Sequence, residues 1–259
     1  MGIPILMYHE VDSRDAVLER YTVSARRFRE QMLYLRDHGY RTISLEDYRR
    51  QAASSEPIEK QIIVTFDDNH ISHFSICAPI LSELNLRATF FVVSSFLDTA
   101  ADLLTREHLR EMKQGGLSIE SHSHTHRFLD DLDAAELDEE LATSRRALED
   151  CIGSEVRYLS CPGGRYNRRV LDTAPAVGYY GVCTSVPGMN HTAGGRWPKA
   201  LNRFLISATT SLETFAKIAS GERNFVRREV LRDRAKTAAK GLLGNQLYHA
   251  LWQRYRKEM

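Results

Sequence analysis

The sequence predicts an α/β fold of about seven strands in parallel βα units, which form a barrel or an open sheet, followed by a C-terminal helical extension. Short apolar runs with the length of buried strands alternate along the chain with longer segments of helical periodicity. The length of 259 residues suits one such barrel with an appendage. Polar residues recur directly after the expected strands, at the edge where parallel sheets build their sites. We therefore expect a barrel over residues 1–220 and an extension over residues 221–259.

The first half of the chain begins this alternation with the apolar run from Ile3 to Tyr8. Ser24 is placed to cap a helix that Gly39 ends, and a second helix begins at Leu45. Strands are expected at residues 3–8, 41–45, 61–68 and 87–93, and helices at residues 24–38 and 73–84.

The second half continues in the same way. Thr105 is placed to cap a helix that Gly115 ends. The charged segment from Ala134 to Cys151 carries apolar residues at helical spacing along one side. Strands are expected at residues 117–121, 156–160, 180–184 and 203–206, and helices at residues 106–114, 134–151 and 167–177. The alternation favours parallel βα units that close into a barrel or form an open doubly wound sheet.

Two adjacent carboxylates, Asp67 and Asp68, end the apolar run at residues 61–64. Carboxylates at the end of a buried strand are costly unless a partner compensates for the loss of water. A helix N-cap beside a surface charge is the alternative interpretation of these residues taken alone.

The histidines after a later strand favour a site. His122 and His126 are four residues apart, so both rings can face one point on a helical turn. Imidazoles at this spacing are common ligands of zinc and its neighbours in the divalent series. One carboxylate would complete a set that leaves positions open for water and substrate. The other carboxylate could then accept a proton from water as a general base.

Composition narrows the class of protein. The formal net charge of +1 gives no attraction toward nucleic acid. The cysteines have no C-x-x-C spacing, which argues against a thiolate zinc site. Neither a signal peptide nor a membrane-spanning stretch is recognisable, so a cytoplasmic location is expected.

The extension differs in character from the barrel. From residue 221 onward it carries ten basic residues against four acidic ones, with apolar residues at roughly helical spacing. One interpretation is a basic amphipathic helix pair on anionic lipid or on a polysaccharide-synthesis partner. The other is a helix that packs on the barrel with its basic face in solvent.

Three segments resemble the first three motifs of the polysaccharide deacetylase family (nodulation-type deacetylases, carbohydrate esterase family four). They are the run Thr65-Phe66-Asp67-Asp68, the spacing His122-Ser123-x-x-His126, and the turn Cys161-Pro162-Gly163-Gly164-x-Tyr166-Asn167. Ala88 to Val92 is also similar to the family's next strand. The resemblance implies a distorted barrel that removes N-acetyl groups from amino-sugar polymers with a bound metal.

By position, the resemblance implies that Asp67 is the general base and that Asp68, His122 and His126 hold the metal. Zn²⁺ is expected, with Co²⁺, Ni²⁺ or Fe²⁺ as alternatives. The opening Leu6-Met7-Tyr8-His9 is similar to the poly-N-acetylglucosamine deacetylase subgroup, which implies that His9 is the general acid.

The third segment should face the substrate. Glycines let the main chain of Pro162, Gly163 and Gly164 approach an oxyanion closely. Tyr166 is expected to line the groove, while Asn167 could equally cap a helix. Many relatives have an arginine before this proline, but here Ser160 and Cys161 stand there. Arg203 is the candidate to orient Asp67, and a solvent-exposed role is its alternative.

The function predicted is therefore metal-dependent N-deacetylation of an N-acetylated amino-sugar glycan, either an exopolysaccharide or its precursor. An amide hydrolase acting on peptidoglycan or a small molecule is one alternative. A barrel that binds glycan, or organises a polymer-synthesis complex, without catalysis is the other.

Overall fold

The computed structural model describes residues 2–14, 19–53, 59–192 and 197–238. Its main strands are β1 (Ile5–Tyr8), β4 (Arg41–Thr42), β5 (Gln61–Phe66), β6 (Thr89–Val92), β7 (Ser118–Ser121), β8 (Tyr158–Ser160), β9 (Gly181–Cys183), β10 (Ala200–Leu201) and β11 (Phe204–Leu205). They form one sheet in the order β10-β9-β8-β7-β6-β5-β1-β11, and β4 pairs with the start of β5. The pairings between these strands are parallel.

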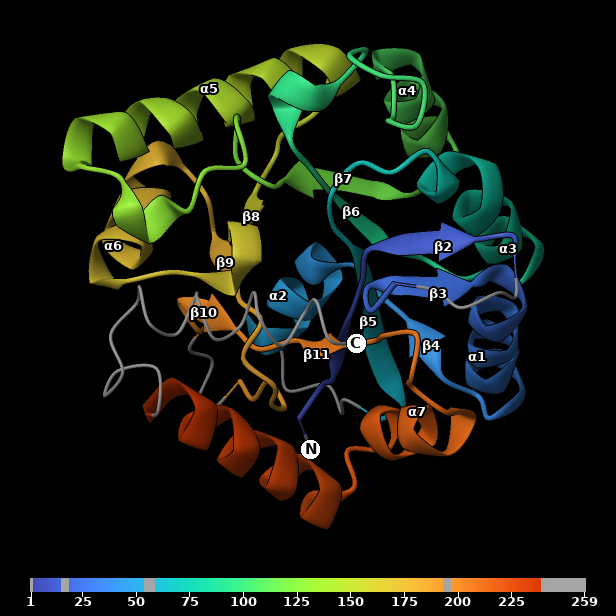
Figure 1. The fold of residues 1–259 in the computed structure, drawn as a ribbon. Coiled ribbons are helices and arrows are strands. Elements are labelled where there is room, and N and C mark those ends of the chain that lie inside the picture. Colours follow the sequence, from blue (N-terminus) through green and yellow to red (C-terminus); the bar gives the residue numbers. More distant parts are fainter. Residues whose placement is uncertain (1, 15–18, 54–58, 193–196, 239–259) are drawn as a thin grey trace.

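The two ends of this strand order are neighbours in the sequence. β10 pairs with β9 at one end of the sheet and β11 pairs with β1 at the other. Only Asn202 and Arg203 separate β10 from β11, so the sheet curls until its ends meet (Figure 1). The predicted distorted barrel is confirmed, and Arg203 sits in the bend that closes it.

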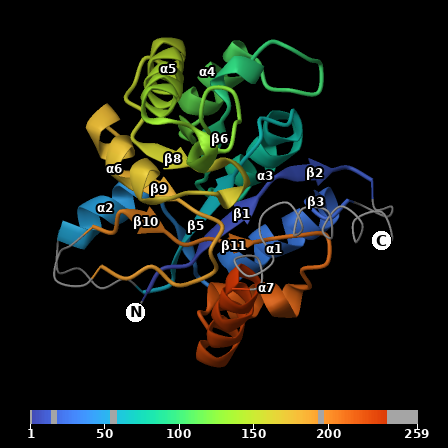
Figure 2. The same cartoon turned by 60° about the vertical axis from the view of Figure 1, so that its left-hand side comes forward.

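Helices surround the sheet, as the views from two sides show (Figures 1 and 2). They are α1 (Ala25–Asp37), α2 (Leu45–Ala53), α3 (Ala78–Glu83), α4 (Arg106–Gln114), α5 (Ala134–Ile152), α6 (Arg168–Val177) and α7 (Leu212–Ala219). The predicted caps Ser24 and Thr105 each accept a hydrogen bond from the backbone N–H three residues on. Asn167 caps α6 in the same way, which confirms that alternative.

One small feature was not predicted. β2 (Glu10–Asp12) and β3 (Thr22–Ser24) form a separate two-stranded parallel sheet. Three residues are too few to show a strand period, so nothing in the local sequence marks these strands.

Strand alternation determines which side chains enter the barrel. Ile63 of β5 lies in an apolar cluster with Ile5 and Phe91, whereas Val64 and Phe66 pack in the larger cluster beneath the helices. Because side chains on a strand alternate between two faces, Thr65 and Asp67 follow Ile63 toward the interior. The interior is therefore apolar below and polar at the carboxyl ends of the strands.

The described part of the extension is helical at residues 223–238. Phe225 and Val226 pack against the main apolar cluster, while Arg223, Arg227 and Arg228 are exposed. This part agrees with the interpretation in which the helix packs on the barrel. The predicted second segment at residues 239–259 lies outside the described residues. No helix in the described ranges is both long and apolar enough to cross a membrane.

Candidate active site

Asp67 is held by a buried ionic network at the top of the barrel. Its side chain receives two parallel hydrogen bonds from Arg203, Nη1 to Oδ1 and Nη2 to Oδ2, each of 2.8 Å. Ser160 Oγ donates a third, of 3.0 Å, to Oδ2. Asp67 is 2% exposed and Arg203 is fully buried. The structure thus brings the candidate Arg203 into direct contact with Asp67 and leaves it no solvent-exposed surface.

The network around Arg203 keeps Asp67 ionised. Burial by itself raises the pKa of Asp67, but the neighbouring charges of Arg203 and His122 outweigh it and hold the pKa below its usual value. The guanidinium also donates to Thr184 O (2.9 Å), to Thr65 Oγ1 (3.2 Å) and to Ser160 Oγ (2.7 Å). A carboxylate fixed in this way has one orientation and stays available to accept a proton.

Asp68 points to a different set of partners. Its Oδ1 lies 3.1 Å from His122 Nε2 and 3.2 Å from His126 Nε2. One ligand atom from each of the three residues can be chosen so that all lie within 4.8 Å of one another. Burial raises the pKa of Asp68, but the two imidazoles lower it well below its usual range. The two adjacent carboxylates therefore occupy separate environments.

The donor atoms of this cluster fit a divalent cation. His122 Nδ1 lies 2.9 Å from the carbonyl oxygen of Ser160, and a carbonyl can only accept, so Nδ1 carries a proton. That leaves His122 Nε2 to face Asp68 Oδ1, which is buried and has no hydrogen bond among the described residues. A carboxylate oxygen that converges with two imidazole nitrogens is suited to hold a cation between them. Two histidines and one carboxylate also leave positions open for water and substrate.

The histidine loop is shaped by Glu140 of α5. One oxygen of Glu140 accepts the backbone N–H groups of His124 and Thr125, at 2.9 and 2.6 Å. Ser123 and His126 have positive φ angles of 67° and 62°, a backbone conformation that residues other than glycine rarely adopt. The loop thus turns sharply enough for the rings of His122 and His126 to converge on the same oxygen, Asp68 Oδ1. His124 instead lies 2.8 Å from Ser94 Oγ through its Nδ1.

The aspartate loop carries similar strain. Asp68 and Asn69 have φ angles of 77° and 57°. Asn69 tolerates this geometry, as expected from its side chain, and it also bridges to β6. Its Nδ2 donates to Val93 O (2.9 Å), and its Oδ1 accepts from Val93 N (2.6 Å). Strained backbone held by such bonds is typical of functional sites.

His9 follows β1 directly and is partly buried. Its ring centre lies 5.0 Å from that of Tyr21, and its Nδ1 is buried without a hydrogen-bond partner among the described residues. Burial lowers the pKa of His9, although the charges of Asp67 and Asp68 oppose this. Its protonated form is therefore a stronger acid than a free imidazolium.

The turn after β8 requires its glycines. Gly163 and Gly164 have φ angles of 61° and 67°. A Cβ on Gly163 would come 2.7 Å from Phe128 Cε1, and one on Gly164 would come 2.3 Å from Ser185 Oγ. The N–H of Gly164 donates to Cys161 O at 2.8 Å, so it is not available to bind substrate. Gly164 is needed here because it has no Cβ.

Tyr166 follows this turn and packs partly buried against the main apolar cluster. Arg165 links this turn to the short helical turn Leu129–Asp131, since its Nε lies 2.9 Å from Asp130 Oδ1. Pro162 has no N–H, and the N–H of Arg165 donates to Pro162 O. Gly163 and Tyr166 therefore keep N–H groups that no described residue occupies.

Sequence reasoning missed two residues that support this site. Ser160 donates to Asp67 with its hydroxyl and accepts from His122 with its carbonyl, and its place at the end of β8 was the available signal. Glu140 lies three residues after Leu137 on the buried side of α5, so helical spacing could have identified it.

Comparison with known proteins agrees with this geometry. The family model described as polysaccharide deacetylase matches residues 54–182. YxkH of Bacillus subtilis (strain 168), which is named for the same family, is 30% identical over 214 residues, or 82% of this chain and 74% of YxkH. The poly-beta-1,6-N-acetyl-D-glucosamine N-deacetylase of Escherichia coli (strain K12) is 30% identical over 139 residues, which cover 48% of this chain and 20% of that protein.

Solved structures give the same assignment. The Streptococcus pyogenes deacetylase PplD in complex with acetate matches with a TM-score of 0.77 and 28% identity, over 85% of this chain and 98% of PplD. The polysaccharide deacetylase BC0361 from Bacillus cereus matches with a TM-score of 0.74 and 26% identity, over 85% of this chain and 69% of that one. The chain therefore belongs to the polysaccharide deacetylase family.

Proposed function

We propose that the protein hydrolyses the N-acetyl amide bonds of an amino-sugar glycan with the help of a divalent metal. The observation that carries this proposal is the separation of two neighbouring carboxylates. Asp67 is locked onto Arg203, whereas Asp68 converges with His122 and His126. One carboxylate is thereby suited to proton transfer and the other to metal binding.

Asp68, His122 and His126 would hold the metal, with Zn²⁺ the first candidate from the ligand set. When bound, a divalent metal supplies a Lewis acid that polarises an amide carbonyl and makes water more acidic. Asp67 accepts a proton from the attacking water. The N–H groups of Gly163 and Tyr166 would be the backbone donors to the oxygen on which negative charge develops. His9 delivers a proton to the leaving amine as acetate departs.

The relatives and one exposed ring support the proposed substrate class. Relatives include the E. coli deacetylase named above and a Bradyrhizobium protein named chitooligosaccharide deacetylase, which is 28% identical over 132 residues. Phe128 lies beside Gly163 at the rim of the candidate site and is 40% exposed. An exposed aromatic ring beside the reacting groups favours a sugar ring as the bound group.

Acetate release from β-1,6- and β-1,4-linked N-acetylglucosamine oligomers tests the proposal. Chelator should abolish release and added Zn²⁺ should restore it. Asp67→Asn should keep its metal and lose about 10²–10⁴ in rate, because the base is removed. Asp68→Asn should lose metal as measured by elemental analysis.

His124→Gln is the matched control, since His124 lies in the same loop but bonds to Ser94. It should keep both metal and activity. Full activity of a metal-loaded Asp67→Asn variant would rule out the role of Asp67. Release from peptidoglycan or from a small amide, with none from the oligomers, would favour the alternative hydrolase. Oligomer binding without any release would favour a glycan-binding barrel.

A further inference from the structure

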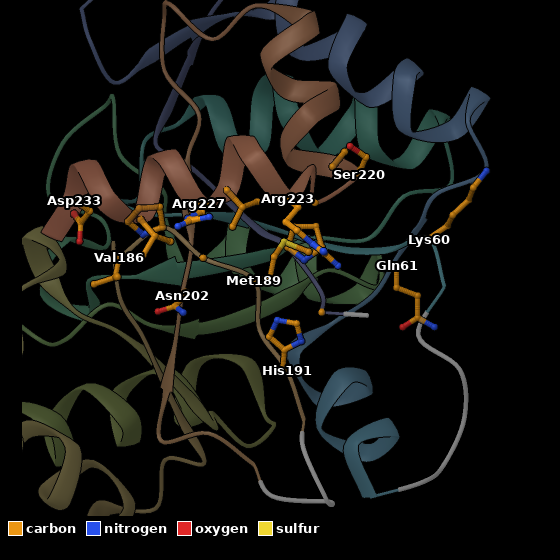
Figure 3. Close-up of a pocket in the computed structure, with 18 of the residues that line it drawn as sticks. Lys60, Gln61, Val186, Met189, His191, Asn202, Ser220, Arg223, Arg227 and Asp233 are labelled. Carbon is orange, nitrogen blue, oxygen red and sulfur yellow. The ribbon is translucent and has the colours of Figure 1, made fainter.

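A cleft lies at the end of the barrel opposite the candidate site. Its volume is about 830 Å³, within the range of small-molecule sites. Gln61, the first residue of β5, lines this cleft, whereas Asp67 follows the last residue of the same strand. A six-residue strand separates the two by about 20 Å. The cleft lies between helix 223–238 and the loop that carries Met189 and His191 (Figure 3).

The charges around this cleft are unbalanced. Its lining includes Lys60, Arg223, Arg227 and Arg234, against one acidic residue, Asp233. The whole chain has a formal net charge of only +1, so positive charge is concentrated here. Such a concentration attracts anions and raises their local concentration.

Three of these cations have no ion-pair partner within the part of the chain that the structure describes. The ammonium of Lys60 is occupied by the carbonyl of His38, at 3.0 Å. In contrast, no carboxylate among the described residues pairs with Arg223, Arg227 or Arg234. Arg232 on the same helix shows the usual alternative, since it forms an ion pair with Glu229 at 2.7 Å.

The rest of the lining combines a second nitrogen donor with apolar surface. Figure 3 shows Arg223, Arg227 and His191 around Met189. The His191 ring is seated against Gly2, where a Cβ would come 2.6 Å from its Cε1. Met189, Val186 and Val226 add apolar contact. The cleft therefore suits an anionic group joined to an apolar body.

We propose that this cleft binds a phosphate ester. A phosphoryl group carries two negative charges and enough oxygens to accept bonds from Arg223 and Arg227 together, and planar guanidinium groups match it well. The organic part would lie against Met189 and Val226. The ester is either a small molecule in solution or the headgroup of a lipid, and this site is independent of the deacetylase assignment.

Calorimetric titration of the full chain with phenyl phosphate, and flotation with vesicles containing phosphatidic acid, tests the proposal. The double variant Arg223→Gln/Arg227→Gln should bind at least about tenfold more weakly, because two charge-assisted bonds are lost. Arg228→Gln is the matched control, an exposed neighbour that does not line the cleft. It should bind within about twofold of the wild type. Arg227→Lys should retain part of the affinity, since it keeps the charge.

The two arms separate the sources of the ester. Saturable binding of phenyl phosphate without vesicle binding identifies a soluble ester, and vesicle binding that the double variant abolishes identifies a lipid headgroup. No binding of either probe by the wild type, or an equal loss in Arg228→Gln, overturns the proposal. Acetate release and the thermal unfolding midpoint should be the same in all variants, since these arginines are exposed and remote from Asp67.

Discussion

Replacement of Arg203 by methionine tests the buried network most directly. Arg203→Met removes five hydrogen bonds of the guanidinium. Among the described side chains, Asp67 then keeps the hydrogen bond from the Ser160 hydroxyl and has His122 Nε2 at 3.9 Å. Removing one member of a buried ion pair costs about 3–5 kcal/mol, because the other charge loses its compensation. The variant should therefore be clearly less stable than the wild type at neutral pH.

The same change should move a pKa. The charge of Arg203 is the largest influence that lowers the pKa of Asp67, so its removal leaves burial to raise that pKa. A protonated Asp67 cannot accept a proton from water. The acidic limb of the pH profile of kcat/KM should therefore shift to higher pH.

The sign of the stability change provides a second measurement. In the wild type the pKa of Asp67 is lowered, so its contribution to stability is present at neutral pH and is lost as pH falls through that pKa. In Arg203→Met the pKa is raised, so the deficit should be largest near pH 7 and smaller near pH 5. Urea unfolding at both pH values measures this difference.

The assay is acetate release from pH 5 to pH 9, with bound metal measured in each sample. Arg203→Lys is the control, because it keeps the positive charge but loses the two parallel hydrogen bonds to Asp67. The acidic limb of its pH profile should therefore shift less than that of Arg203→Met. A folded, metal-loaded Arg203→Met variant with an unmoved acidic limb would refute the assignment of Arg203 as the group that sets the pKa of Asp67.

Three further predictions concern other parts of the molecule. Gly164→Ala should lower the free energy of unfolding in urea by about 1–3 kcal/mol more than Gly39→Ala does. Both glycines have positive φ, but a Cβ would collide with Ser185 only at Gly164. Equal losses in the two variants would contradict this. Burial raises the pKa of Glu120 to about 8, so wild-type stability should fall as pH rises from about 4.5 toward 8. Glu120→Gln should remove this pH dependence of stability, because the glutamine oxygen can still accept the two backbone N–H groups but the side chain does not ionise. An unchanged slope of stability against pH would argue against the role of Glu120. Phe128→Ala should raise KM for a long oligomer about fivefold and leave kcat unchanged, because about 1 kcal/mol of contact between the ring and the sugar is lost. An equal rise in KM for the monosaccharide would contradict a role of Phe128 in polymer binding.

Local sequence patterns predicted most of the secondary structure. The segment from Ala134 to Cys151 forms α5 within one residue, and Ser24 and Thr105 cap the helices that follow them. Caps and helical periods depend on residues only three or four apart, so they can be read without the tertiary fold. The sheet of β2 and β3 was missed, since its strands are short and pair across the chain.

Local sequence patterns likewise predicted one part of the candidate site but not the other. The residue types and spacing of Asp67, Asp68, His122 and His126 are enough by themselves to indicate metal chemistry. The residue that orients Asp67 could only be suggested, because 136 positions separate it from Arg203. A contact over that distance depends on how the sheet closes and leaves no periodic signal in the sequence.

The sequence by itself determined the alternation of strands and helices and which residues could serve as base and ligands. Only the tertiary structure decided how these residues are paired. The bend between β10 and β11 closes the barrel and brings Arg203 into the interior, where a buried guanidinium is stable because Asp67 and Ser160 satisfy it. The bend that joins the two ends of the sheet thus also supplies the cation that keeps Asp67 ionised.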